Sequence, residues 1–276
     1  MHSTRRLLLR SLGRVRSVAD LAFLPRPEVV ETGCMRHLGT PYGGWYFHED
    51  SALRNGTVIS CGAGEDISFD VQLASTYGAR VFLVDPTPRA IEHVNSTLDR
   101  LGRRNSSAFA DGGRQKADAY DLEHVRPGQL VLVDKAISSR SGLREFFPPR
   151  NQDHVSYSLS EAKVRESTRE LSIEVESISY ADLLNEYLDV ARPALLKLDI
   201  EGAEVEVLPH ILAMPPRQVL VEYDVLRSSR RARKVWARIH GLLTDEVYAL
   251  CRVDGLNYTY VQRHIIESDC AHAASS

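Results

Sequence analysis

The chain has 276 residues, and its 34 Lys and Arg residues against 37 Asp and Glu residues give a formal net charge of −3. A hydrophobic share of 43% with 26% charged residues is typical of a soluble globular protein and excludes collagen-like, disordered and membrane-spanning classes. The near-neutral balance lacks the basic excess of a nucleic-acid-binding domain, so we expect no nucleic-acid partner.

The four cysteines are far apart in the sequence and form no CxxC pair. This spacing predicts neither a zinc site nor a disulfide framework. We therefore expect a reducing, cytoplasmic location. No stretch approaches the ~18 uninterrupted apolar residues of a spanning helix, so we expect no transmembrane segment.

Residues 1–27 form a basic amphipathic extension in which five arginines precede the first acidic residue. As a helix, this segment would place Leu8 and Leu12 on one face and most of its arginines on another. A solvated appended helix, a transit peptide and an interfacial membrane anchor all fit this pattern, so peripheral membrane contact stays open. Prolines end the segment, and we expect one folded domain over residues 28–276.

Within that domain, short apolar strands alternate with helical patterns, which is typical of βαβ units around a parallel sheet. Expected helices cover residues 66–77, 89–101 and 180–188, and another begins near residue 204. Residues 139–169 are charged and irregular, which indicates an insertion or lid. The expected strands are residues 57–61, 80–84, 129–133, 194–198 and 218–221.

Glycines follow the first expected strand, and an acid ends the second. Gly62 and Gly64 leave room for a ligand to approach the backbone, and Asp85 can accept hydrogen bonds from ribose hydroxyls. Ligands of parallel α/β sheets bind outside the carboxyl ends of the strands. The arrangement therefore indicates adenosine binding.

The residues after the turn distinguish between adenosine cofactors. Ile67 stands where a dinucleotide fingerprint has a third small residue, and Glu65 and Asp66 put carboxylates where a pyrophosphate would need the helix dipole. These acids would tolerate the sulfonium and ammonium of S-adenosylmethionine, although simple first-turn capping also explains them. A nicotinamide oxidoreductase is disfavoured.

Five blocks of the sequence carry a resemblance to a known family. They are residues 59–70 (ISCGAGEDISFD), 85–88 (DPTP), 196–204 (LKLDIEGAE), 41–45 (PYGGW) and 155–159 (VSYSL). These blocks resemble the FkbM family of S-adenosylmethionine-dependent methyltransferases. The resemblance implies an α/β, Rossmann-like class I methyltransferase fold, with a mostly parallel central sheet and helices on both faces. It also implies transfer of a methyl group to a hydroxyl of a sugar, lipid or secondary metabolite.

The same resemblance implies which residues contact the cofactor. Ser60 stands where the family usually has a strand-end acid, so Glu65 or Asp66 would supply the carboxylate toward the methionine part. The implied contacts are Ser60, Gly62, Ala63, Gly64, Asp66 and Asp85.

Carboxylates also follow the fourth expected strand, and they are the candidate catalytic residues. In an extended chain Asp199 and Glu201 would share one side, and either could accept the proton of an acceptor hydroxyl. Interaction with the dipole of the following helix is the alternative for Glu201 and the preferred explanation for Glu204. Lys197 points away from its apolar neighbours, which is typical of a paired structural charge. Although Asp199, Glu201 and Glu222 offer oxygen ligands for Mg²⁺, we expect no metal site.

Tyr42, Trp45 and His154 are the candidate substrate contacts. The aromatic residues could close over cofactor or acceptor, although Trp45 suits core packing equally well, and His154 is a candidate base. We therefore predict an S-adenosylmethionine-dependent O-methyltransferase with a small-molecule or glycan hydroxyl acceptor. The alternative is a non-catalytic Rossmann-like accessory protein that binds the cofactor without turnover.

Overall fold

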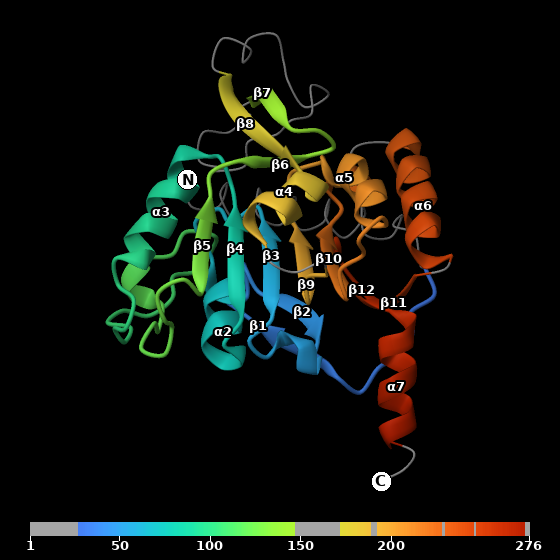
Figure 1. Cartoon of the computed structure of the whole chain (residues 1–276), viewed down its shortest axis with the longest axis horizontal. Coiled ribbons are helices and arrows are strands. Elements are labelled where there is room, and N and C mark those ends of the chain that lie inside the picture. The colour runs from blue at the N-terminus through green and yellow to red at the C-terminus, as the bar shows by residue number, and fades with distance from the viewer. Residues whose placement is uncertain (1–26, 147–171, 189–191, 228–229, 246, 274–276) are drawn as a thin grey trace, which may run out of the picture.

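The computed structural model describes residues 27–146, 172–188, 192–227, 230–245 and 247–273. The predicted extension, apart from its last residue, lies outside these ranges, and so does most of segment 139–169. At the centre of the described residues is a seven-stranded sheet (Figure 1). Its strands, in spatial order, are β11 (Tyr248–Asp254), β12 (Asn257–Gln262), β10 (Gln218–Glu222), β9 (Leu195–Leu198), β3 (Thr57–Cys61), β4 (Arg80–Val84) and β5 (Leu130–Val133).

Five neighbouring strands, from β10 to β5, run parallel. They are the five strands that the sequence predicts, and each boundary agrees within one residue. The remaining two strands form a hairpin that joins the sheet antiparallel to β10. The sequence analysis missed this hairpin.

Helices cover both faces of the sheet, as predicted. On one face, the core contains side chains of α4 (Tyr180–Tyr187), α5 (Glu204–Ile211) and α6 (Arg230–Thr244). The opposite face is covered by α2 (Ser68–Tyr77), α3 (Pro88–Leu98) and the hairpin of β1 (Met35–Leu38) and β2 (Trp45–His48). A last helix, α7 (Arg263–Ala273), follows β12 and extends beyond the lower edge of the sheet in Figure 1. Short 3-10 turns occur at η1 (Ser51–Leu53), η2 (Ala117–Ala119) and η5 (Asp224–Arg227).

Two helix boundaries differ from the prediction. Helix α2 begins at Ser68, two residues late, because the Asp66 side chain lies outside the helix and accepts the Ser68 N–H at 3.0 Å. Helix α3 ends at Leu98, three residues early, since the chain then tightens into i→i+3 bonds such as Leu101 N–H to Leu98 O at 3.2 Å.

Above the carboxyl ends of the parallel strands stands a three-stranded sheet with the order β6 (Ala136–Ser138), β8 (Ile173–Ser179), β7 (Gly142–Phe146) (Figure 1). The expectation that residues 139–169 are irregular is therefore wrong for residues 142–146. These residues form an ordered strand because they pair antiparallel with β8, about thirty positions further along the chain. Local composition does not reveal such a partner.

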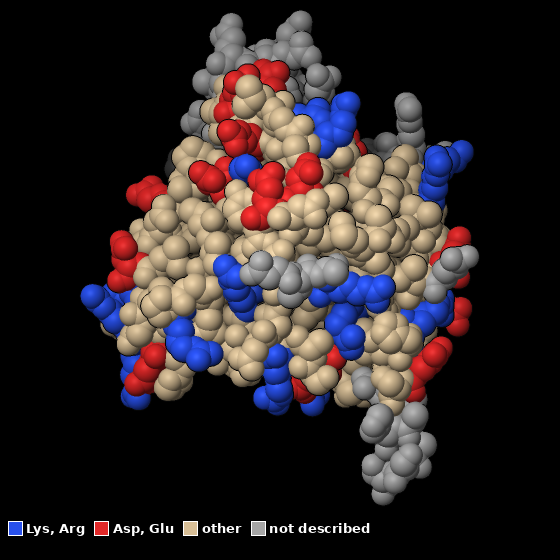
Figure 2. All heavy atoms as spheres, in the orientation of Figure 1, with Lys and Arg blue, Asp and Glu red and all other residues tan. Residues whose placement is uncertain are grey.

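Charge is unevenly distributed over the visible face of the molecule. Acidic side chains gather mainly in its upper part, near the carboxyl ends of the strands, whereas most basic side chains lie in its lower half (Figure 2). No helix among the described residues is long and apolar enough to span a membrane.

Candidate active site

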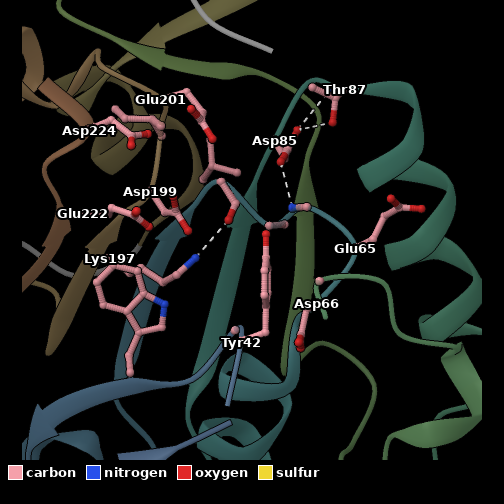
Figure 3. A pocket seen from close by; sticks show the side chains of 18 of the residues that line it. Tyr42, Glu65, Asp66, Asp85, Thr87, Lys197, Asp199, Glu201, Glu222 and Asp224 are labelled. Carbon is pink, nitrogen blue, oxygen red and sulfur yellow. Dashed lines mark hydrogen bonds between the residues drawn. The ribbon is translucent and has the colours of Figure 1, made fainter. Parts of the chain in front are cut away.

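A cavity of about 820 Å³ opens where the parallel strands end, beneath the three-stranded sheet. Most of its lining comes from the loops after β3, β4, β9 and β10, from the loop before β2 and from the hairpin of β11 and β12. The loop of residues 111–114 and strands β6 and β7 complete it. Figure 3 shows the side chains converging on this space. The volume is in the range of small-molecule sites.

The turn after β3 contains two glycines that serve different purposes. Both have a positive φ, 81° for Gly62 and 57° for Gly64, which glycine adopts most readily. A Cβ on Gly62 would lie 1.8 Å from the Asp199 carbonyl oxygen, so position 62 must be glycine for packing between strands. A Cβ on Gly64 would meet nothing within 4 Å. The backbone at Gly64 therefore faces open space.

Asp85 follows β4, lines the cavity and is held by three hydrogen bonds. One oxygen accepts the Thr87 N–H at 2.9 Å and the Thr87 hydroxyl at 2.7 Å, and the other accepts the Gly64 N–H at 3.0 Å (Figure 3). The side chain is almost fully buried. Since a carboxylate has about four acceptor positions, Asp85 is oriented by its own loop and retains capacity for a ligand donor.

Both acids that follow the glycine turn line the cavity, but protein groups already engage them. Glu65 forms ion pairs with Arg89 at 2.5 Å and with Arg114 at 3.3 Å. Asp66 accepts the Thr40 hydroxyl at 2.6 Å as well as the Ser68 N–H. These contacts fix the loop before α2, which gives both acids a structural role whether or not they also contact a ligand.

Two aromatic residues stand where the chain enters β2: Tyr42 lies in the preceding loop, and Trp45 is the first residue of the strand. Tyr42 is exposed and directs its phenol group toward the cavity (Figure 3). Trp45 is buried, and its ring lies against the Lys197 ammonium group. Partial burial raises the pKa of Tyr42, and the carboxylates of Asp199 and Glu222 raise it further. The Tyr42 hydroxyl is therefore a protonated hydrogen-bond donor beside an acidic surface at neutral pH.

Carboxylates gather around the ends of β9 and β10, opposite Asp85. Asp199 and Glu201 follow β9, and Glu222 and Asp224 follow β10 (Figure 3). All four line the cavity and make this side of it acidic. Among the described residues, no group of three or more His, Cys, Asp or Glu side chains is arranged to hold a metal ion.

Glu204, the first residue of α5, lies fully buried below this group. One of its oxygens accepts the Gly202 N–H at 2.8 Å. Burial, together with the nearby carboxylates of Asp224 and Asp199, raises the pKa of Glu204 to about 8, against the opposing effect of the Gly202 hydrogen bond. The side chain is thus a neutral acid at pH 7, so its expected interaction with the helix dipole is not that of a full negative charge.

The structure alters two details of the sequence-based site. Ser60 is fully buried and does not line the cavity, because β3 turns its hydroxyl into the protein toward Asp70. The strand alternation expected through Asp199 and Glu201 is wrong, because β9 ends at Leu198 and Glu201 adopts a left-handed φ of 55°. The turn nevertheless brings both acids to the cavity. His154 lies outside the described residues.

The other predicted residues, Gly62, Ala63, Gly64, Asp66, Asp85, Tyr42 and Trp45, all line the cavity. Sequence reasoning missed several other lining residues, among them the polar Asp224, Asp254 and Asn257. Asp224 stands two positions after an expected strand, which is a usable signal. Asp254 and Asn257 flank the turn of the C-terminal hairpin, and recognising the alternating pattern of residues 257–262 would have located them.

An α/β sheet with a ligand-sized cavity at its carboxyl edge is the general architecture of a nucleotide- or cofactor-binding enzyme. The family model described as Methyltransferase FkbM domain matches residues 60–240. The match covers more than half of the chain, which therefore belongs to this family and is a methyltransferase. No curated protein and no solved structure matches the chain significantly.

Proposed function

We propose that the protein transfers a methyl group from S-adenosylmethionine to a hydroxyl oxygen of a sugar, lipid or secondary metabolite. One observation carries this proposal. A single cavity joins an open glycine turn and a buried, oriented Asp85 on one side with the carboxylates of Asp199 and Glu201 on the other.

The strand order supports a Rossmann-like class I methyltransferase fold. Strand β3 lies between β4 and β5 on one side and β9 and β10 on the other. The chain thus adds strands first to one side of β3 and then to the other, so the strand order reverses at β3. In doubly wound sheets, such a reversal opens the crevice that binds the ligand. Antiparallel β12, inserted between β10 and β11, completes the order.

The residues at the reversal suit the proposed cofactor. Gly64 leaves open space beside the backbone, and Asp85 offers a charged acceptor for ribose hydroxyls. Acids outnumber bases around the cavity, which favours a ligand with positive charges over a dinucleotide pyrophosphate. S-adenosylmethionine, when bound, supplies a methyl group on a cationic sulfur.

Asp199 and Glu201 are suited to accept the acceptor's proton. The hydroxyl oxygen uses a lone pair to bond to the methyl carbon, while the carbon–sulfur bond breaks and leaves its electron pair on sulfur. The O–H proton passes to a carboxylate, and the O–H electron pair stays on oxygen. The protein also has to hold the reacting atoms in line and exclude water, and the aromatic rings of Tyr42 and Trp45, which line the cavity, suit that role.

The acidic lining also supports the expected class of acceptor. The carboxylates of the lining would repel the phosphates of a nucleic acid. They would not repel a neutral small molecule or glycan that presents hydroxyl groups. Tyr42 offers a phenol for such an acceptor. The buried thiols of Cys61 and Cys251 form no disulfide, which supports a reducing, cytoplasmic location.

The test compares the wild type with Asp199→Asn and Glu201→Gln, using calorimetry with S-adenosylhomocysteine and radiolabelled methyl incorporation into a panel of hydroxylated glycans and metabolites. We expect cofactor affinity to stay within about threefold, while transfer falls by about 10²-fold in the variant that lacks the base. Equal rates in all three proteins would refute the acid–base assignment. Tight cofactor binding by the wild type without transfer to any acceptor would favour a non-catalytic binding protein.

A further inference from the structure

Lys197 carries a charge in a largely apolar layer of the protein. It lies on β9, the strand next to β3, and is only 4% exposed. It projects to the face that α2 and β2 cover, opposite to Leu196 and Leu198. A buried ammonium group is costly unless it is paired and hydrogen-bonded, so its contacts indicate what it stabilises.

The most specific contact of Lys197 is with the glycine turn. Its Nζ donates to the Gly62 carbonyl oxygen at 2.9 Å (Figure 3). The N–H of Gly62 donates in turn to the Val84 carbonyl at 3.0 Å, and the Gly64 N–H donates to Asp85 at 3.0 Å. The turn is therefore held from two strands at once, by Lys197 of β9 and by the end of β4.

Two other groups accompany the Lys197 ammonium. Nζ lies 5.5 Å from the centre of the Trp45 ring, which shields it with an aromatic face. Asp70 of α2 is fully buried and interacts electrostatically with Lys197. Burial raises the pKa of Asp70, and the positive charge of Lys197 acts in the opposite direction. Each charge thus reduces the cost of burying the other.

We propose that Lys197 is a positioning residue for the cofactor: matched by Asp70 and covered by Trp45, it holds the Gly62 carbonyl and so fixes the turn against which Asp85 is set. The proposal rests on the proposed function, because it takes the glycine turn as the cofactor side of the cavity. Lys197 also lines the cavity, so direct contact with the amino-acid part of the ligand is the competing explanation.

The experiment separates positioning from charge balance with two variants of the full-length protein. Lys197→Met leaves the Asp70 carboxyl buried without its counter-charge, and we expect a large loss of stability. Lys197→Met/Asp70→Asn removes both charges and is expected to regain most of that stability in denaturant unfolding. If Lys197 positions the turn, the double variant still binds S-adenosylhomocysteine about tenfold or more weakly than the wild type, because ordering the released turn consumes part of the binding free energy.

A second ligand separates positioning from direct contact. Methylthioadenosine lacks the amino-acid part of S-adenosylhomocysteine, so a displaced turn should weaken both ligands by a similar factor. Loss of affinity for S-adenosylhomocysteine alone would overturn the proposal in favour of direct contact. Recovery of wild-type affinity in the double variant would also overturn it, because Lys197 would then only neutralise Asp70.

Amide hydrogen exchange tests the proposal without a ligand. We expect the backbone of residues 62–64 to lose protection in the double variant, and unchanged protection there would refute the positioning role. A wild type that binds neither ligand would contradict the proposed function, while the exchange result still decides the role of Lys197.

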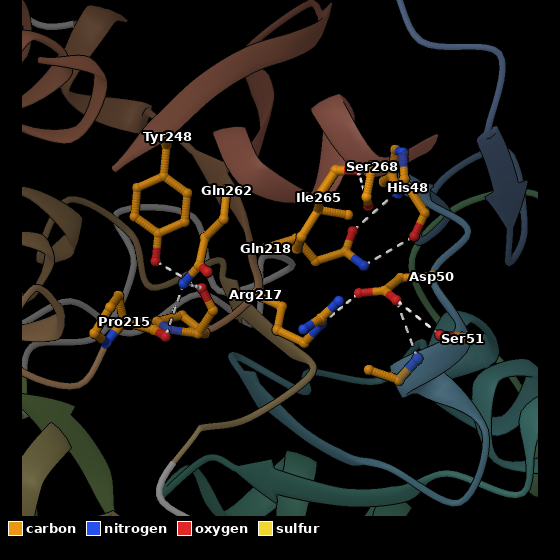
Figure 4. A network of polar contacts seen from close by, with 12 residues as sticks. His48, Asp50, Ser51, Pro215, Arg217, Gln218, Tyr248, Gln262, Ile265 and Ser268 are labelled. Carbon is orange, nitrogen blue, oxygen red and sulfur yellow. Dashed lines mark hydrogen bonds and ion pairs between the residues drawn. The ribbon is translucent and has the colours of Figure 1, made fainter. Parts of the chain in front are cut away.

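The matched control is Asp50→Asn/Arg217→Met. It removes an ion pair of 2.5 Å at the opposite end of the sheet, next to the His48–Gln218 hydrogen bonds (Figure 4). This control should leave both ligand affinities and the exchange of residues 62–64 unchanged.

Discussion

The buried acid Glu204 should make the stability of this protein depend on pH. Burial and, to a smaller extent, the charges of Asp224 and Asp199 raise its pKa from 4.5 to about 8. The folded protein therefore keeps a proton that the unfolded chain releases. Folding therefore takes up a proton between these two values, and stability falls as the pH rises through that window. At 1.36 kcal/mol for each pH unit of difference, the loss between pH 5 and pH 8 is about 3 kcal/mol.

Replacing Glu204 with Gln removes this ionisation and keeps an oxygen that can accept the Gly202 N–H. We expect the free energy of unfolding of Glu204→Gln, measured by urea denaturation, to gain about 3 kcal/mol relative to the wild type between pH 5 and pH 8. Glu206→Gln is the control, because Glu206 lies exposed on the same helical turn. Parallel pH profiles for wild type and Glu204→Gln would refute the reasoning.

Three further substitutions have defined expectations. Asp85→Ala should weaken S-adenosylhomocysteine by about 1.5–3 kcal/mol in calorimetry, through the loss of charge-assisted hydrogen bonds; unchanged affinity in a folded variant would remove the ribose assignment. Gly64→Ala places a methyl group in the open space beside the turn at a positive φ, so it should cost about 1–2 kcal/mol of stability and reduce cofactor affinity; normal binding would mean that the ligand lies elsewhere. Arg217→Met should cost about 2–3 kcal/mol in denaturant unfolding, because it strips the buried Asp50 carboxylate of its partner, and an unchanged midpoint would contradict this.

The parallel strands could be predicted because each is a short, mostly apolar run between breakers. β3 and β4 have the predicted bounds, since Gly56 and Gly62 enclose the first run and Asp85 ends the second. Strands of this kind are buried on both faces, so their own composition identifies them without knowledge of a partner.

The two antiparallel parts of the fold depend on partners that lie far away in sequence. β12 mixes polar and apolar residues, and what makes it a strand is its register against β10, with Tyr260 opposite Val219. Likewise, β7 is mostly exposed and includes the charged Arg144 and Glu145, and it is a strand through its pairing with β8. Local pattern underestimates such strands because their stability comes from cross-strand contacts.

For the site, the sequence predicted which residues meet but not how each is held. The spacing of Gly62, Gly64 and Asp85 was sufficient because both loops follow adjacent parallel strands. The engagement of Glu65 by Arg89, like the contact of Lys197 with Gly62, joins separate elements that no local spacing relates. Alternation correctly placed Lys197 opposite to its apolar neighbours, yet it carried no information about what lies on that side.

These long-range contacts bear on how the two halves of the cavity are aligned. Gly62 approaches the Asp199 carbonyl so closely that a Cβ would lie 1.8 Å from it, while Lys197, two residues before Asp199, holds the Gly62 carbonyl from the same strand. The turn on the proposed cofactor side and the strand end that carries the candidate base are thus in direct contact. Since methyl transfer depends on the alignment of oxygen, carbon and sulfur, a displacement of either element would be passed to the other. The backbone packing of β3 against β9 therefore helps to keep the two sides of the cavity aligned.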